Sequence, residues 1–93
     1  MGHLSTHVLD TSKGIPAKGV TWTIYKIEDR RKRINSGETN IDGRTNDPLL
    51  SGNTFEAGVY EIVFEVAKYF EKSGTSLIEE PFLDSIPIRF RIF

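Results

Sequence analysis

The stretch from Val20 to Glu28, VTWTIYKIE, decides the fold class because its apolar residues recur at every second position. In an extended chain Val20, Trp22 and Ile24 fall on one face, and the residues between them fall on the other. Its β-branched and aromatic content favours a strand over a helix. We therefore predict a strand here with one face in the core.

The rest of the chain repeats this kind of signal. Apolar residues alternate again in 58–66 and in 82–93, and turn signals recur every 8–12 residues or so, which is typical of a β-sandwich or barrel. We predict a single all-β domain over residues 1–93. Its predicted elements are strands at 3–10, 20–28, 34–39, 58–66 and 82–93, turns at 28–33 and 40–43, a loop at 46–52, and a short helix within 67–74 that Gly74 ends.

Composition excludes several classes of function. The chain has 93 residues, 38% of them hydrophobic and 27% charged, as in ordinary globular domains. Its 12 basic and 13 acidic residues give a net charge of −1, which argues against a dedicated nucleic-acid or anionic-membrane binder. Cysteine is absent, so disulfides, thiolate catalysis and cysteine-based zinc sites are excluded. No run approaches the roughly 20 apolar residues of a membrane helix.

His7 is a candidate general base, because histidine side chains exchange protons near neutral pH. The plainer interpretation is a surface or half-buried strand histidine. A metal site shared by His3 and His7 is disfavoured: four residues of strand would separate the two imidazoles by roughly 13 Å. We predict no metal site.

Arg44 follows the Asp42-Gly43 turn, where a guanidinium could hold a carboxylate or a developing oxyanion through paired N–H groups. The plainer interpretation is a solvated loop arginine. The basic run at 30–33 could bind phosphate, but it neighbours Glu28 and Asp29, so we interpret it as a solvated turn. The aromatic residues Trp22, Tyr25, Tyr60 and Phe64 are interpreted as core rather than as a stacking surface.

Four motifs carry a resemblance to one family: LSTHVLDT at 4–11, running on through GIPA at 14–17; TNIDGR at 39–44; GVYEIVF at 58–64, leading into Tyr69-Phe70; and the segment 82–90. In order and spacing they resemble the 5-hydroxyisourate hydrolases, the transthyretin-related enzymes of urate breakdown. The first motif is specific to the hydrolases, whereas the third and fourth would also suit transthyretin. The resemblance covers essentially the whole chain.

The resemblance implies a transthyretin-like (prealbumin-like) sandwich of two sheets with one short helix. It also implies hydrolysis of the ring amide of 5-hydroxyisourate to 2-oxo-4-hydroxy-4-carboxy-5-ureidoimidazoline, with no cofactor. His7 matches the family histidine that orients or activates water, and Arg44 matches the arginine that clamps the substrate. The family assembles as a homotetramer, with its site between subunits.

The sequence departs from the family pattern at its C-terminus. Family members continue for about two more strands beyond Phe93, which carry a second histidine and a terminal serine. We therefore expect a domain truncated at the C-terminus, impaired in catalysis and doubtful as a tetramer. A cytoplasmic location is expected, or a peroxisomal one if a C-terminal signal was lost.

Two other classes of function compete with the hydrolase. One is a transthyretin-like carrier of a small hydrophobic ligand, and the other is a β-sandwich interaction module. The residues that distinguish a hydrolase from a carrier are Leu4 to His7 together with Arg44, since a carrier needs neither a base nor a guanidinium at its site. These residues favour the hydrolase.

Overall fold

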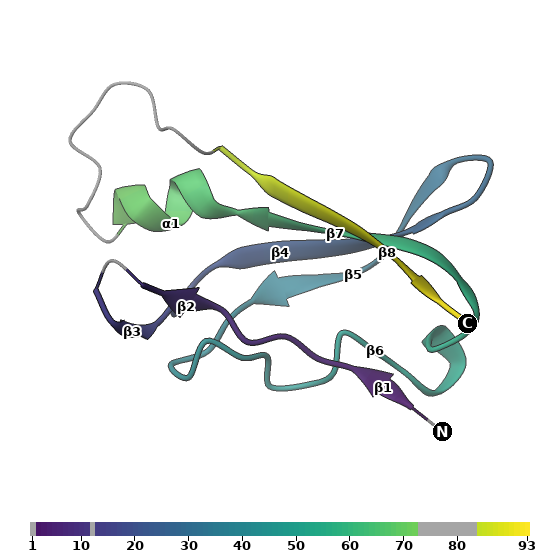
Figure 1. Ribbon diagram of the computed structural model, residues 1–93, viewed down its shortest axis with the longest axis horizontal. Coiled ribbons are helices and arrows are strands. Elements are labelled where there is room, and N and C mark those ends of the chain that lie inside the picture. The colour runs from purple at the N-terminus through teal and green to yellow at the C-terminus, as the bar shows by residue number, and fades with distance from the viewer. Residues whose placement is uncertain (1, 12, 73–83) are drawn as a thin grey trace.

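The computed structural model describes residues 2–11, 13–72 and 84–93, and within these ranges its regular secondary structure is mostly strand (Figure 1). The elements are β1 (His3–Leu4), β2 (Leu9–Asp10), β3 (Ile15–Pro16), β4 (Thr21–Ile27), β5 (Arg31–Glu38), β6 (Leu50–Ser51), the 3-10 turn η1 (Gly52–Thr54), β7 (Gly58–Glu65), α1 (Val66–Lys72) and β8 (Ile86–Ile92).

The long strands form one antiparallel sheet in the order β5-β4-β7-β8. Strand β4 lies inside it, and its register places Trp22 opposite Phe64 and Ile24 opposite Ile62. Directly opposed residues in antiparallel strands share a face, so these apolar pairs all point to the same side.

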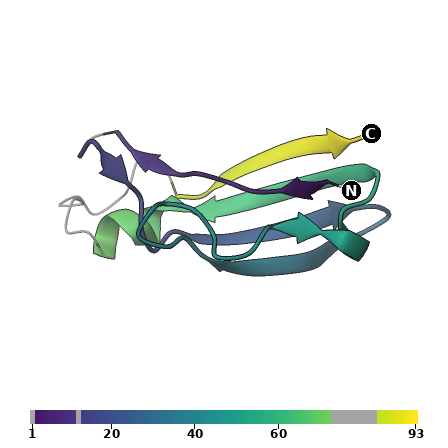
Figure 2. The ribbon, with the colours of Figure 1, turned by 90° about the horizontal axis from the view of Figure 1, so that it is seen from below.

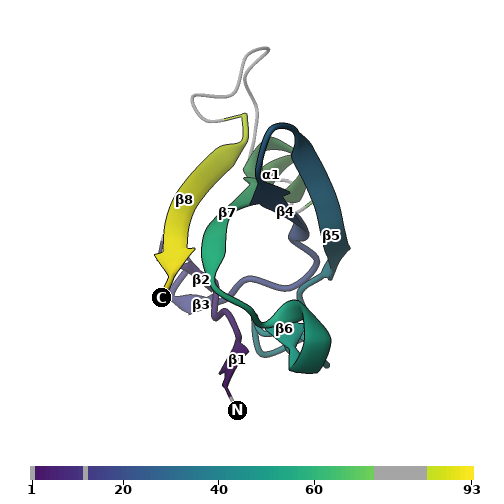
Figure 3. The same ribbon diagram turned by 90° about the vertical axis from the view of Figure 1, so that its right-hand side faces the viewer.

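The short strands make a second layer on that apolar side. Strands β1 and β6 pair with each other, as do β2 and β3. Figure 2 shows the four long strands running side by side, and Figure 3 shows the sheet arching over the layer of short strands. The predicted all-β sandwich with one short helix is confirmed.

The core follows the alternation seen in the sequence. Val20, Trp22 and Ile24 are buried, as are Tyr60, Ile62 and Phe64 from β7. Trp22 lies beneath Gly37 of β5, where an added Cβ would approach the indole Cζ2 to 3.1 Å. The buried indole N–H has no hydrogen-bond partner among the described residues. Other buried apolar residues are Ala17, Leu49, Leu50, Ala67 and Tyr69.

Several predicted boundaries were wrong. The segment 3–10 is not one strand but β1 and β2, joined by a stretch that pairs with the rest of the layer at the His7–Arg44 bridge and through hydrogen bonds of Val8. Strand β5 begins at Arg31, inside the predicted turn, because a β-bulge at Ile34 keeps it paired with β4. The predicted loop at 46–52 contains β6, and Val66 begins α1 rather than ending β7. Gly74 and Phe82 lie outside the described residues.

Strand β8 carries its apolar residues on the core side, as predicted, but the second layer does not cover it fully. Ile88 is paired with the buried Ile62, yet it is 49% exposed. Within the described ranges, no helix is both long and apolar enough to cross a membrane.

Candidate functional site

The structure brings His7 and Arg44 together in the second layer. They are partners in an isolated antiparallel bridge, and beside them the backbone N–H of Val8 donates to the carbonyl of Gly43 at 2.8 Å. Since antiparallel partners point to the same side of the backbone, the imidazole and the guanidinium leave the layer on one face. Both residues are exposed to solvent.

The turn before Arg44 explains the TNIDGR motif. The side-chain oxygen of Asn40 accepts from the backbone N–H groups of Asp42 at 2.9 Å and Arg44 at 3.1 Å. Gly43 has a φ of 74°, and a Cβ there would lie 2.3 Å from the carbonyl oxygen of Val8. Only glycine therefore allows the close approach that pairs His7 with Arg44.

Thr39 fixes this turn to the four-stranded sheet. Its buried hydroxyl donates to the carbonyl of Ala17 at 2.6 Å and accepts from the N–H of Val20 at 2.9 Å. Ala17 in turn donates its N–H to the carbonyl of Val8 at 2.9 Å. One threonine thus links the turn, the segment after His7 and the start of β4.

Asp10 and Tyr69 anchor the other end of the His7 segment. The buried Tyr69 hydroxyl donates to the buried carboxylate of Asp10 at 2.7 Å, which ties β2 to α1. Burial, followed by this hydrogen bond and the negative charge of Asp10, raises the pKa of Tyr69 to about 12. The sequence alone does not pair these residues, because each lies in a different motif and neither motif indicates a partner.

Arg44 lines a shallow hollow of about 250 Å³ at the edge of the second layer, and most of its lining residues are of polar types. The hydroxyl, amide and guanidinium groups that line the hollow suit a small molecule rich in oxygen and nitrogen. Because Arg44 is paired with His7, a candidate base lies beside the hollow. His7 itself does not line it. The lining residues are His3, Ser5, Thr6, Arg44, Thr45, Asn46, Asp47 and Pro48.

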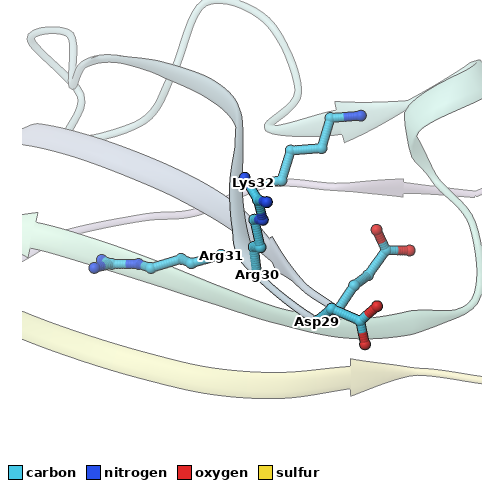
Figure 4. A pocket seen from close by; sticks show the side chains of 5 residues that line it. Asp29, Arg30, Arg31 and Lys32 are labelled. Carbon is cyan, nitrogen blue, oxygen red and sulfur yellow. The ribbon is translucent and has the colours of Figure 1, made fainter.

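A larger hollow of about 600 Å³ lies at the β4–β5 turn (Figure 4), and neither His7 nor Arg44 lines it. It is lined by charged residues of both signs, from Glu28 to Lys32. This lining contains solvated charged side chains and no histidine beside an arginine, so we do not assign the candidate functional site to this hollow. Part of the basic run is strand rather than turn, since Arg31 to Arg33 belong to β5.

Among the described residues, no group of three or more histidine or acidic side chains could hold a metal ion. His3 is paired with Ser51 on β6, whereas His7 is paired with Arg44. The two histidines therefore belong to different parts of the layer.

Comparison with known proteins identifies the family. The model of the HIUase/Transthyretin family matches residues 4–93. The chain is 45% identical over 92 residues to 5-hydroxyisourate hydrolase 2 of Rhizobium meliloti (strain 1021), covering 98% of this chain and 77% of that protein. Among solved structures, Klebsiella pneumoniae 5-hydroxyisourate hydrolase matches with a TM-score of 0.80 and 32% identity, over 99% of this chain and 79% of that one.

Transthyretin from Sparus aurata matches with a TM-score of 0.83 but only 28% identity, over 96% of this chain and 74% of that one. The two-layer sandwich is thus common to both branches, while sequence identity is higher on the hydrolase side. The chain belongs to the HIUase/Transthyretin family.

Proposed function

We propose that this chain is a 5-hydroxyisourate hydrolase, which opens the ring amide of its substrate to give 2-oxo-4-hydroxy-4-carboxy-5-ureidoimidazoline. The single observation that carries the proposal is the pairing of His7 with Arg44 beside a polar hollow, in a chain 45% identical to a protein named for this reaction. Amide hydrolysis requires a water molecule made nucleophilic and a carbonyl oxygen whose developing charge is stabilised.

In this proposal His7 acts on the water. Its neutral imidazole accepts a proton as the water oxygen bonds to the ring carbonyl carbon, and it returns the proton to the ring nitrogen when the C–N bond breaks. The fold supports the role by position. The Val8–Gly43 hydrogen bond and the Asp10–Tyr69 anchor hold the segment that follows His7, and before it the N–H of Leu49 donates to the carbonyl of Leu4 at 2.8 Å.

Arg44 binds the substrate and its developing negative charge. A guanidinium presents parallel N–H groups, which match the adjacent oxygen atoms of a small oxygen-rich ring compound. Asn40 holds the backbone of Arg44 by two hydrogen bonds: its side-chain oxygen accepts from the Arg44 N–H, and its own N–H donates to the Arg44 carbonyl. The position of the Arg44 backbone on the layer is therefore fixed.

The test is turnover of freshly generated 5-hydroxyisourate, followed by its ultraviolet decay with the uncatalysed decay subtracted. We expect His7→Ala to lower kcat by roughly 100-fold or more, as removal of a general base does. Arg44→Lys keeps the charge but loses the paired geometry, and we expect it to raise KM and lower kcat/KM by about tenfold or more.

Arg30→Ala is the matched control for Arg44, since it removes an exposed arginine outside both the bridge and the hollow. His3→Ala tests the other histidine, which lines the hollow but lies outside the His7–Arg44 bridge. We expect each to keep kcat within about threefold of the unsubstituted chain. If His3→Ala costs as much as His7→Ala, the base is wrongly assigned. If a folded chain shows no turnover at all, the proposed activity is wrong for it.

The expected impairment of the 93-residue chain stays a prediction. The matches cover 77% of the Rhizobium meliloti protein and 79% of the Klebsiella pneumoniae structure. Measuring kcat/KM for this chain beside the Rhizobium meliloti protein under the same conditions tests it directly. Equal values for the two proteins would contradict the prediction.

We further propose self-assembly through the second layer; the homotetramer is the state that the family resemblance implies, and whether this chain reaches it stays a prediction. The β2–β3 hairpin exposes Leu9 by 59% and Ile15 by 50%, and both line one hollow. Exposed apolar side chains of this size favour contact with another subunit. Sedimentation equilibrium measures the state, and a monomer at all concentrations would refute it. A cytoplasmic location likewise stays a prediction.

A further inference from the structure

The outer face of the four-stranded sheet, which looks away from the second layer, carries a concentration of arginine that the sequence does not reveal. The register aligns one set of residues across all four strands, and the next set on the same face lies two residues along. The first set is Arg31, Ile27, Val59 and Arg91; the second is Arg33, Tyr25, Glu61 and Arg89. Each set therefore has arginine on both edge strands.

The end of the face formed by these two sets has more positive charge than its acidic residue neutralises. Glu61 binds two of the arginines at once, with Arg31 at 3.5 Å and Arg89 at 3.2 Å. Four arginines against one glutamate leave a charge of +3 in the two sets, although the chain as a whole has −1. Neither Arg33 nor Arg91 forms an ion pair within the described residues, and both are exposed.

The charges are also spaced for an extended ligand. Three strand spacings of about 4.8 Å separate the edge arginines by roughly 14 Å, and successive sets lie roughly 7 Å apart along the strands. Between the edges, half-buried Ile27 and Val59 form a neutral floor. The next residues along this face, Thr23 and Val63, are uncharged, and beyond them Thr21 lies opposite Glu38 on one side and Glu65 on the other. The positive charge is therefore confined to the end of the sheet that bears the β4–β5 turn.

We propose that this surface, named here the arginine face, binds an acidic segment of a partner protein. Carboxylates at alternating positions of an extended peptide are about 7 Å apart, which matches the spacing of the sets. Paired N–H groups of arginine suit carboxylates. The proposal is independent of the hydrolase activity, because the face lies on the opposite side of the sheet from the layer that carries His7 and Arg44 (Figure 3).

Other occupants fit less well. Bases of a single-stranded nucleic acid need open aromatic rings, and the ring of Tyr25 is covered by the Arg31 guanidinium at 3.7 Å from its centroid. A second copy stacked on this face would bury roughly 500 Å² per subunit, estimated from four strands and four such sets. That area is below the roughly 800 Å² per partner of a standard interface.

The test uses a fluorescein-labelled peptide of about twelve alternating Glu and Ser residues, titrated with the whole chain and followed by fluorescence anisotropy. We expect a dissociation constant in the micromolar range, rising at least tenfold between 0.05 and 0.5 M NaCl because salt screens exposed charges. We expect the same peptide with Gln in place of Glu not to bind.

Variants place the site. Arg33→Ser with Arg91→Ser removes two charges without touching the Glu61 ion pairs, and we expect at least a tenfold weaker peptide complex. The matched control is Arg30→Ser with Lys32→Ser, which removes the same charge nearby; in Figure 4 Lys32 extends to the other side of the strand from Arg31. We expect the control to change binding less than twofold, and both doubles to leave 5-hydroxyisourate turnover unchanged.

Equal weakening by the two double variants would overturn the proposal, since it would mean attraction by net charge alone. Tighter binding of a single-stranded oligonucleotide or of phosphatidylserine vesicles than of the peptide would also overturn it. So would loss of self-association by Arg33→Ser with Arg91→Ser, which would make the occupant a second copy. Backbone amide shifts in unsubstituted chain on adding peptide must fall on 31–33 and 89–91; shifts elsewhere refute the site even if a variant fails to fold.

Discussion

The four-stranded sheet and the layer beneath it are built in opposite ways. In the sheet, β4 is paired along seven positions with β5 on one side and β7 on the other. In the second layer, β1, β2, β3 and β6 are two residues long each, and the candidate residues meet at a single bridge. The core depends on the long ladders, whereas the site depends on a few single hydrogen bonds. Substitutions in the sheet should therefore lower stability more than turnover, and substitutions at the site should lower turnover more than stability.

The largest expected effect comes from the sheet. Ile24 is fully buried at 0% exposure, and Ile24→Ala removes core volume that its neighbours cannot refill. We expect the free energy of unfolding to fall by roughly 3–4 kcal/mol, measured by urea denaturation. The folded fraction should keep its turnover per molecule. Ile41→Ala, at a residue 71% exposed, is the control and should change stability by less than about 0.5 kcal/mol.

Gly43→Ala should damage the site more than the sheet. The new Cβ would lie 2.3 Å from the Val8 carbonyl oxygen, and the residue would be held at a φ of 74°. We expect a loss of roughly 2–3 kcal/mol in stability and more than tenfold in turnover, because the Val8–Gly43 bond must open. Gly14→Ala shares the positive φ but has open space around it, so it should cost only about 1 kcal/mol and spare turnover. Equal turnover in the two variants would show that the His7–Arg44 bridge does not matter.

Tyr69→Phe tests the anchor between the layer and α1. Losing a buried hydrogen bond to a carboxylate should cost roughly 1–2 kcal/mol near neutral pH. The pKa of Tyr69 is raised from 10.0 to about 12, so the fold favours the neutral hydroxyl. Its contribution is complete below pH 10 and is lost as the pH rises from 10 to about 12. Stability of the unsubstituted chain should therefore fall through that window, and the drop should be smaller in Tyr69→Phe; identical slopes would mean that Tyr69 does not titrate as described.

Glu61→Gln gives the smallest expected effect. Its carboxylate joins Arg31 and Arg89 across the outer face, but both arginines are largely exposed. Exposed ion pairs contribute little, so we expect a loss of about 0.5–1 kcal/mol that shrinks further in high salt. Thermal unfolding at two salt concentrations measures it. A loss above about 2 kcal/mol would show that the outer face contributes to stability as strongly as the core.

Sequence reasoning predicted the sheet well because its signal is local. Alternation in Val20–Glu28 and Gly58–Val66 identified the buried faces of β4 and β7, and the glycine of the Asp42-Gly43 turn has the positive φ that such a turn requires. The second layer could not be predicted in the same way. Its strands are two residues long, so they contain no period, and the segment 3–10 was consequently predicted as one strand.

The site was predicted only through resemblance. No pattern in the residues alone pairs His7 with Arg44, since their contact depends on the carbonyl of Val8 passing close to Gly43. The arginine face was missed for a related reason. The bulge at Ile34 sets which side of β5 carries Arg31 and Arg33, and Arg89 and Arg91 arrive from the far end of the chain.

The indole of Trp22 is an internal fluorophore that lies in the four-stranded sheet and not in the second layer that carries His7 and Arg44. It is the single tryptophan, it lies in the sheet beneath Gly37, and its N–H has no hydrogen-bond partner among the described residues. An indole in such dry surroundings emits at shorter wavelength than one in water. Its emission will report the opening of β4 from β5, while rearrangement around His7 and Arg44 will leave its colour unchanged. The emission wavelength of Trp22 can thus distinguish an unfolded protein from a folded one in which only the His7–Arg44 site is disrupted.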